Sequence, residues 1–115
     1  VNFQGVSKVN KFWGVWNALP EKRYRNFIST VADMQMVWLS KNEILSVWPE
    51  ESYALQKTPA EKIVCVEVHD FCSLLEKLSY DPSSSICVFP TDKDYSEKHP
   101  HELLRDILDE LERIE

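Results

Sequence analysis

The strongest constraint on the fold is a short pattern that occurs twice: a β-branched residue, a large aromatic residue and a proline. The two copies are Val47-Trp48-Pro49 and Val88-Phe89-Pro90, and each is followed a few residues later by a tyrosine, Tyr53 or Tyr95. Valine and aromatic residues favour strands, whereas proline cannot donate a hydrogen bond to a sheet. The pattern therefore predicts two strands that stop abruptly, each with an aromatic residue in its last position.

Hydrophobic spacing and helix-capping residues predict the other elements. Residues 36–39 and 44–48 are expected to form a hairpin, the β-branched run 63–68 is expected to be a central strand, and Asp70 is expected to cap a helix. The charged segment 21–25 is expected to be solvated. The expected helices cover residues 7–19, 20–33, 70–78 and 100–115, and the further expected strands are 86–89 and a short edge strand near Tyr95.

This order of elements predicts an α+β fold. The 115 residues are enough for one domain with its own core. We expect a single domain over residues 6–115, with a four- to five-stranded, mainly antiparallel sheet covered by two N-terminal helices and a C-terminal amphipathic helix. Residues 1–5 resemble the remnant of a protease-cleavage tag and are left out of this prediction.

Composition excludes several classes of function. The two glycines are too few for a phosphate-binding loop, and no apolar run approaches the length of a membrane span. Residues 42–115 carry seven basic and seventeen acidic side chains. This excess argues against nucleic-acid binding and favours a basic protein partner. The three cysteines fit reduced thiols in a cytoplasmic protein, and we expect no cofactor and no membrane association.

Two sequence features could support chemistry, and for both a structural role is the favoured interpretation. His99 and His101 could bind a metal, but a helix that begins at Pro100 would make their side chains diverge, so we expect no metal and a capping role for His99. Cys72 lies near a predicted helix start and close to His69, as an activated thiol would. It falls in an apolar stretch, which favours a buried thiol.

The loops after the two strand ends contain the candidate binding residues. Each loop carries two acids and a tyrosine, and if the strands are neighbours these side chains could share one rim. Such a rim could supply an acid–base pair, a solvated edge or a protein-binding surface anchored by an exposed tryptophan. The candidate partner-binding residues are Trp48, Glu50, Glu51, Tyr53, Asp92, Asp94 and Tyr95.

An ordered set of short motifs runs along the chain: Leu19-Pro20-Glu21, Arg23-Tyr24, Phe27-Ile28, Val31-Ala32-Asp33, Val37-Trp38, Val47-Trp48-Pro49, Tyr53-Ala54, Val88-Phe89-Pro90-Thr91 and the helix 100–115. Together these motifs resemble a bacterial family, the domain of unknown function 2750. The resemblance covers about residues 7–115 and implies no activity or catalytic residues. Two glycine-containing stretches of the family are missing here, one between the first two strands and one at residues 92–95. The order of elements also resembles, at the level of fold, SseB-like and immunity-like proteins.

The sequence therefore favours a small bacterial protein-interaction module, of immunity-like type, that binds a basic partner and is a monomer or a weak homodimer. One alternative is a small enzyme that uses Cys72 or the acids Glu50, Glu51, Asp92 and Asp94. Another is a structural module that associates with itself through its aromatic and aliphatic helix faces.

Overall fold

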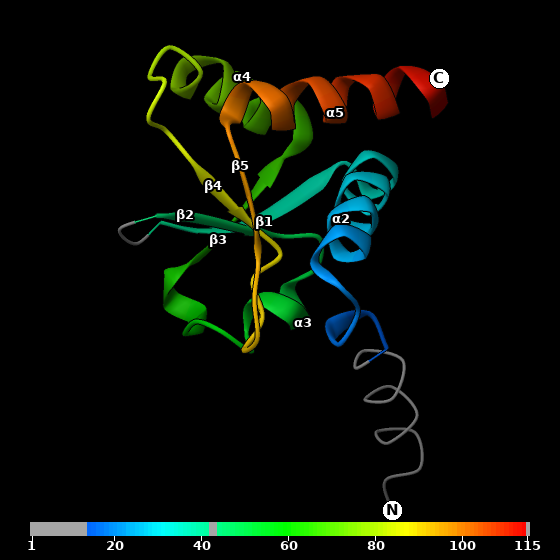
Figure 1. Cartoon of the computed structure of the whole chain (residues 1–115), viewed down its shortest axis with the longest axis vertical. Helices are drawn as coiled ribbons and strands as arrows, with labels where there is room; N and C mark the ends of the chain where they lie inside the picture. The colour runs from blue at the N-terminus through cyan, green and yellow to red at the C-terminus, as the bar shows by residue number, and fades with distance from the viewer. Residues whose placement is uncertain (1–13, 42–43, 115) are drawn as a thin grey trace, which may run out of the picture.

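The computed structural model describes residues 14–41 and 44–114 of the chain. It is an α+β domain built on a five-stranded sheet with the order β3-β1-β2-β4-β5 (Figure 1). The predictions for residues 1–5 and for most of the helix 7–19 concern residues outside those ranges. The elements are α2 (Pro20–Met34), β1 (Met36–Lys41), β2 (Leu45–Trp48), α3 (Glu51–Ala54), the 3-10 helix η1 (Ala60–Lys62), β3 (Ile63–Glu67), α4 (Val68–Leu78), β4 (Ile86–Val88), β5 (Ser96–Lys98) and α5 (Pro100–Ile114).

The two aromatic–proline strand ends lie side by side. Strands β2 and β4 are parallel neighbours, and Val47 is paired with Val88. The other three strand pairs are antiparallel, so the sheet is mixed and mainly antiparallel, as predicted. Because the two strands are parallel and in register, both prolines fall at the same end of the sheet.

The predicted hairpin and the short edge strand are confirmed, but the predicted central position of β3 is wrong. In the described sheet β3 lies at the edge and pairs with β1. Its Val64 is 53% exposed, although β-branched residues of this kind usually fill central strands. A run of five residues cannot by itself distinguish an edge strand from a central one.

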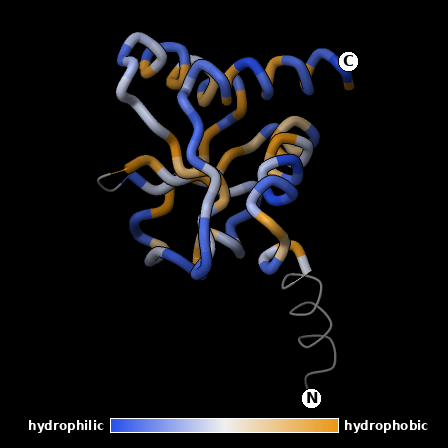
Figure 2. Tube along the Cα trace, viewed as in Figure 1, coloured by the Kyte–Doolittle hydropathy of each residue, from blue (hydrophilic) through white to orange (hydrophobic). Residues whose placement is uncertain are grey.

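Helices cover both faces of the sheet. In Figure 1, α4 and α5 lie on one side and α3 lies on the opposite side. Helix α5 packs against both α2 and α4, and α3 packs on β1 and β2. Hydrophobic residues gather along the strands and alternate with polar residues along α5 (Figure 2). Leu103, Ile107 and Leu111 of α5 are accordingly buried in the core.

The helix starts follow local capping chemistry, with one correction. Glu67, rather than the predicted Asp70, caps α4, because its carboxylate accepts hydrogen bonds from the backbone N–H groups of His69 and Asp70. Before α5, the Nδ1 atom of His99 accepts a hydrogen bond from the backbone N–H of His101 at 3.1 Å, so the predicted capping role of His99 is confirmed.

The start of α2 is solvated only in part. Glu21, Lys22 and Arg25 are exposed as predicted, but Arg23 and Tyr24 are buried. Arg23 is 2% exposed and Tyr24 is 9% exposed. The hydroxyl of Tyr24 donates a hydrogen bond to the Asp106 carboxylate of α5, and burial, more than Asp106 itself, raises the pKa of Tyr24. The polar groups on this side of α2 therefore connect the helix to the rest of the fold.

Candidate functional site

The aromatic residues at the two strand ends belong to the core. Trp48, Tyr53 and Phe89 are at most 5% exposed, and the indole N–H of Trp48 donates to the backbone oxygen of Pro90 at 3.1 Å. The ring of Tyr53 lies 4.8 Å from that of Phe89, centroid to centroid. In this structure, neither Trp48 nor Tyr53 offers its side chain to a partner, because both are buried.

Arg23 holds the end of β4 in place. Its guanidinium donates hydrogen bonds to the backbone oxygens of Phe89 and Asp94, both at 3.1 Å, and to that of Ala18. It also pairs with the carboxylate of Asp94. Phe89 has a φ of 52°, which is rare for a bulky residue, and the Arg23 contact stabilises the carbonyl that this turn leaves inside.

The four acids predicted to share one rim separate into two groups. The carboxylate of Asp94 forms an ion pair with Arg23. The carboxylate of Asp92 forms one with Lys57, whose Nζ lies 3.3 Å from Asp92 Oδ1. Tyr95, on the same loop, is 49% exposed. Glu50 and Glu51 instead line a groove on the other side of the β2 end. The structure therefore places Glu50 and Glu51 in a groove, and it gives Asp94 a structural contact.

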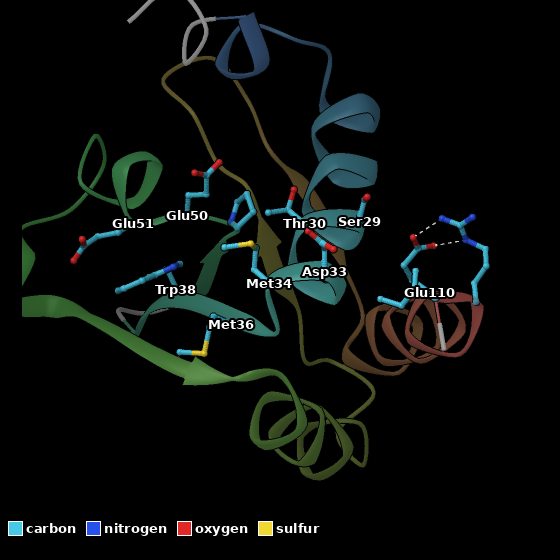
Figure 3. A pocket seen from close by; sticks show the side chains of 12 residues that line it. Ser29, Thr30, Asp33, Met34, Met36, Trp38, Glu50, Glu51 and Glu110 are labelled. Carbon is cyan, nitrogen blue, oxygen red and sulfur yellow. Dashed lines mark hydrogen bonds and ion pairs between the residues drawn. The ribbon is translucent and has the colours of Figure 1, made fainter. Parts of the chain in front are cut away.

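We name this groove the methionine groove, because it contains both methionines of the chain (Figure 3). Its volume is about 560 Å³. Four parts of the fold form it: the end of α2, strand β1, the turn before α3 and the end of α5. Its lining residues are Ser29, Thr30, Asp33, Met34, Met36, Trp38, Pro49, Glu50, Glu51, Glu110, Arg113 and Ile114.

The apolar part of the groove is exposed. Met34 is 63% exposed, Met36 is 37% exposed and Ile114 is 48% exposed. Trp38 is half-buried, although Trp48, its partner across the β1–β2 pair, is fully covered. Flexible, polarizable methionine side chains and a partly exposed indole are surfaces that adapt to a ligand or a partner.

The groove has a negative electrostatic potential. Among the described residues, no ion pair involves Asp33, Glu50 or Glu51. The last turn of α2 contains no basic residue, so the negative end of the helix dipole adds to the field of Asp33. Glu51 also lies close enough to β3 to add to the effect of burial, which raises the pKa of the Cys65 thiol.

One basic side chain is present among the lining residues, and it is already paired. Arg113 binds Glu110 through two hydrogen bonds, of 3.1 Å from Nε and 2.6 Å from Nη2. The hydrogen bond from Arg113 lowers the pKa of the Glu110 carboxyl, which stays ionised. The groove can therefore attract a cation through its three other carboxylates.

Cys72 has the properties of a structural thiol. It is 9% exposed, and burial, followed by the nearby Glu67, raises its pKa to about 11. A thiol with a raised pKa is a poor nucleophile at neutral pH. The Nδ1 atom of His69 lies 2.6 Å from the Glu67 carboxylate.

The metal site considered for His99 and His101 finds no support in the described geometry. The His99 ring caps α5 through Nδ1 and contacts the backbone oxygen of Asp81 through Nε2 at 3.1 Å. Within residues 14–41 and 44–114, no group of three or more histidine, cysteine, aspartate or glutamate side chains is placed to hold a metal ion. Over the same residues, no helix is both long and apolar enough to cross a membrane.

Sequence reasoning missed the groove residues Asp33, Met34, Met36 and Trp38. A signal was present, because Met36 and Trp38 alternate on β1 directly after the end of α2, so they must share one face of the sheet. The resemblance to the domain of unknown function 2750 stays a prediction, since no family model, curated protein or solved structure matches this chain.

Proposed function

We propose that this protein is a protein-interaction module whose methionine groove binds a basic segment of a partner protein. The observation that carries the proposal is the combination, in one open groove, of exposed Met34 and Met36 with three carboxylates, those of Asp33, Glu50 and Glu51, that form no ion pair within the described residues. Apolar contact supplies affinity there, and the carboxylates select a positively charged partner and speed the encounter.

The charge of the whole chain supports the same proposal. The net charge is −6, and the acidic residues concentrate after residue 41. A small acidic protein that covers a basic protein would act as an immunity protein does, and this is the specific form of the module that we propose. The groove is partly open to the surface, and a protein segment needs only one accessible face.

Selective labelling of methionine methyl groups provides a direct test. Both methionines line the groove, so each of the two methyl signals in an NMR spectrum reports on it. A short synthetic peptide of alternating leucine and basic residues is expected to shift both signals. The matching peptide with glutamate in place of the basic residues is expected to shift neither.

Charge variants show whether the groove is the part of the protein that binds the peptide. Glu50→Gln with Glu51→Gln removes two charges from the groove and is expected to weaken peptide binding about tenfold, which corresponds to about 1.4 kcal/mol. The matched control, Glu61→Gln with Glu76→Gln, removes two exposed charges elsewhere and is expected to leave binding unchanged. Equal weakening by both pairs, or no shift of either methyl signal, would contradict the proposal.

A further inference from the structure

The methionine groove places an indole face beside carboxylates that have no ion-pair partner among the described residues. Trp38 lies on β1 between Trp48 on β2 and Cys65 on β3, and all three share one face of the sheet. Trp48 is covered, while Trp38 keeps part of its ring at the floor of the groove. Figure 3 shows Trp38 between Glu51 and Met36.

The position of Glu51 is supported by its electrostatic effect. Its carboxylate acts on the thiol of Cys65, the direct neighbour of Trp38 across the β1–β3 pair. Glu50 acts in the same way on the buried Tyr53, whose pKa it raises in addition to the effect of burial. Figure 3 shows the two consecutive glutamates pointing in different directions, and both line the groove.

We propose that the basic segment bound by this groove presents an arginine, rather than a lysine, whose guanidinium stacks on Trp38 and binds Glu51. This inference rests on the proposed function and specifies its partner. A guanidinium is planar and weakly hydrated, so it can lie on an indole and a thioether while its edge donates to carboxylates. A lysine ammonium is compact and strongly hydrated, and it loses more hydration on the same apolar floor.

The protein already contains an arrangement of this type. The guanidinium carbon of Arg23 lies 5.9 Å from the centroid of the Phe89 ring, and its nitrogen pairs with the carboxylate of Asp94. The groove offers the same partners, an aromatic face and a carboxylate, and no cation of the described residues pairs with Glu51. Arg113 is held by Glu110 and is therefore not the cation that fills this position.

A set of three peptides tests the inference. They have identical sequences with leucine on both sides of one central residue, which is arginine, lysine or citrulline, and all carry lysines at the other basic positions. Citrulline keeps the planar shape of arginine without its charge. Calorimetric titration is expected to give about fivefold tighter binding for arginine than for lysine, and the weakest binding for citrulline.

Two groove variants assign the preference to its residues. Trp38→Leu and, separately, Glu51→Gln are each expected to reduce the preference for arginine over lysine to less than about twofold. The exposed residue Glu76 provides the control, because Glu76→Gln is expected to keep the preference intact. Circular dichroism establishes that each variant is folded, and Glu51→Gln lies on the surface, so it remains informative if Trp38→Leu unfolds.

The outcomes separate this inference from the proposed function. If lysine and arginine peptides bind equally and both shift the methionine methyl signals, the arginine preference is wrong and the basic-segment module stands. If none of the three peptides shifts those signals, the proposed function and the inference both fail. If arginine is preferred but Trp38→Leu and Glu51→Gln leave the preference unchanged, the inferred contact is wrong.

Discussion

The two aromatic–proline strand ends have the same local sequence pattern and lie on paired strands, yet the fold completes them differently. At the β4 end, Phe89 turns with a φ of 52° and Arg23 binds the backbone that follows. At the β2 end, the chain enters α3, and Glu50 and Glu51 stay exposed at the methionine groove. One end is bound by a residue far away in the sequence, and the other keeps its two acids exposed.

This difference shows that a local sequence pattern determines where a strand ends, but not which contacts the residues after the strand make. Arg23 is 66 residues from Phe89 and 71 residues from Asp94. Closing the long chain segment between these residues costs conformational entropy. At the β4 end the bound backbone is then held in one position and is not free to rearrange around a partner. The acids of the β2 end have no corresponding cation among the described residues. The four predictions below test this contrast.

The largest expected effect on stability comes from removing the hydrogen bonds of Arg23. Arg23→Met leaves the carbonyls of Ala18, Phe89 and Asp94 without their donor, and we expect it to lower the free energy of unfolding by about 3 kcal/mol or more. Denaturant titration measures the change. Arg25→Met is the control, because Arg25 makes only an exposed pair with Glu21 and should cost about 0.5 kcal/mol or less.

The next largest effect is expected at Trp48, whose indole connects the end of β2 to Pro90 at the end of β4. Trp48→Phe removes the indole donor to Pro90 and leaves a space in the core, and we expect a loss of about 2 kcal/mol in unfolding free energy. Trp38→Phe changes the same residue type on the paired strand at a half-buried position and should cost less than about 1 kcal/mol. Equal losses for the two variants would mean that the Pro90 contact contributes nothing.

A smaller effect distinguishes the acids of the two ends. Asp94→Ala removes the carboxylate partner of Arg23 and should lower the unfolding free energy by about 1 kcal/mol, since Asp94 is partly solvated. Glu51→Ala removes an acid from the β2 end and should change stability by about 0.5 kcal/mol or less. Thermal unfolding of both variants under one buffer condition provides the comparison. A larger loss for Glu51→Ala would reverse the contrast between the two ends.

The smallest effect is a titration at the β2 end. Burial, with a further contribution from Glu50, raises the pKa of Tyr53 above its usual 10.0. A raised pKa in the folded state means that stability is fully present below pH 10 and is lost as the pH rises through the folded value. Glu50→Gln should lower the pKa of Tyr53 toward 10.0. Tyrosinate absorbance, corrected with Tyr53→Phe, measures the shift, and an unchanged value would show that Glu50 points elsewhere.

Much of the fold was predictable because it depends on local signals. Pro20 and Pro100 mark the starts of α2 and α5, and the hairpin of β1 and β2 follows from two largely apolar runs separated by a polar turn. The end of β3 was misplaced by one residue, because Glu67 caps α4 where Asp70 had been expected. Acidic residues at both positions could cap, and only the geometry of the chain decides between them.

The candidate site was predicted only in part, and the reason is tertiary. Glu50 and Glu51 were identified from their place after Pro49, and both do line the groove. Asp92 and Asp94 have the same kind of place after Pro90, but Lys57 and Arg23 bind them. The burial of Arg23 could not be read from the surrounding charged residues, because three of its partners are backbone oxygens, which carry no sequence signal, and the fourth is a carboxylate 71 residues away.

The Arg23 contact has a practical consequence for engineering the chain. The segment 91–95 is polar and mostly exposed, and such loops usually accept inserted tags or labels. Here the backbone oxygen and the carboxylate of Asp94 both bind the buried guanidinium, so a longer loop would have to give up that anchor. Fusions and reporter insertions should therefore avoid this loop, even though its polar composition is typical of loops that accept insertions.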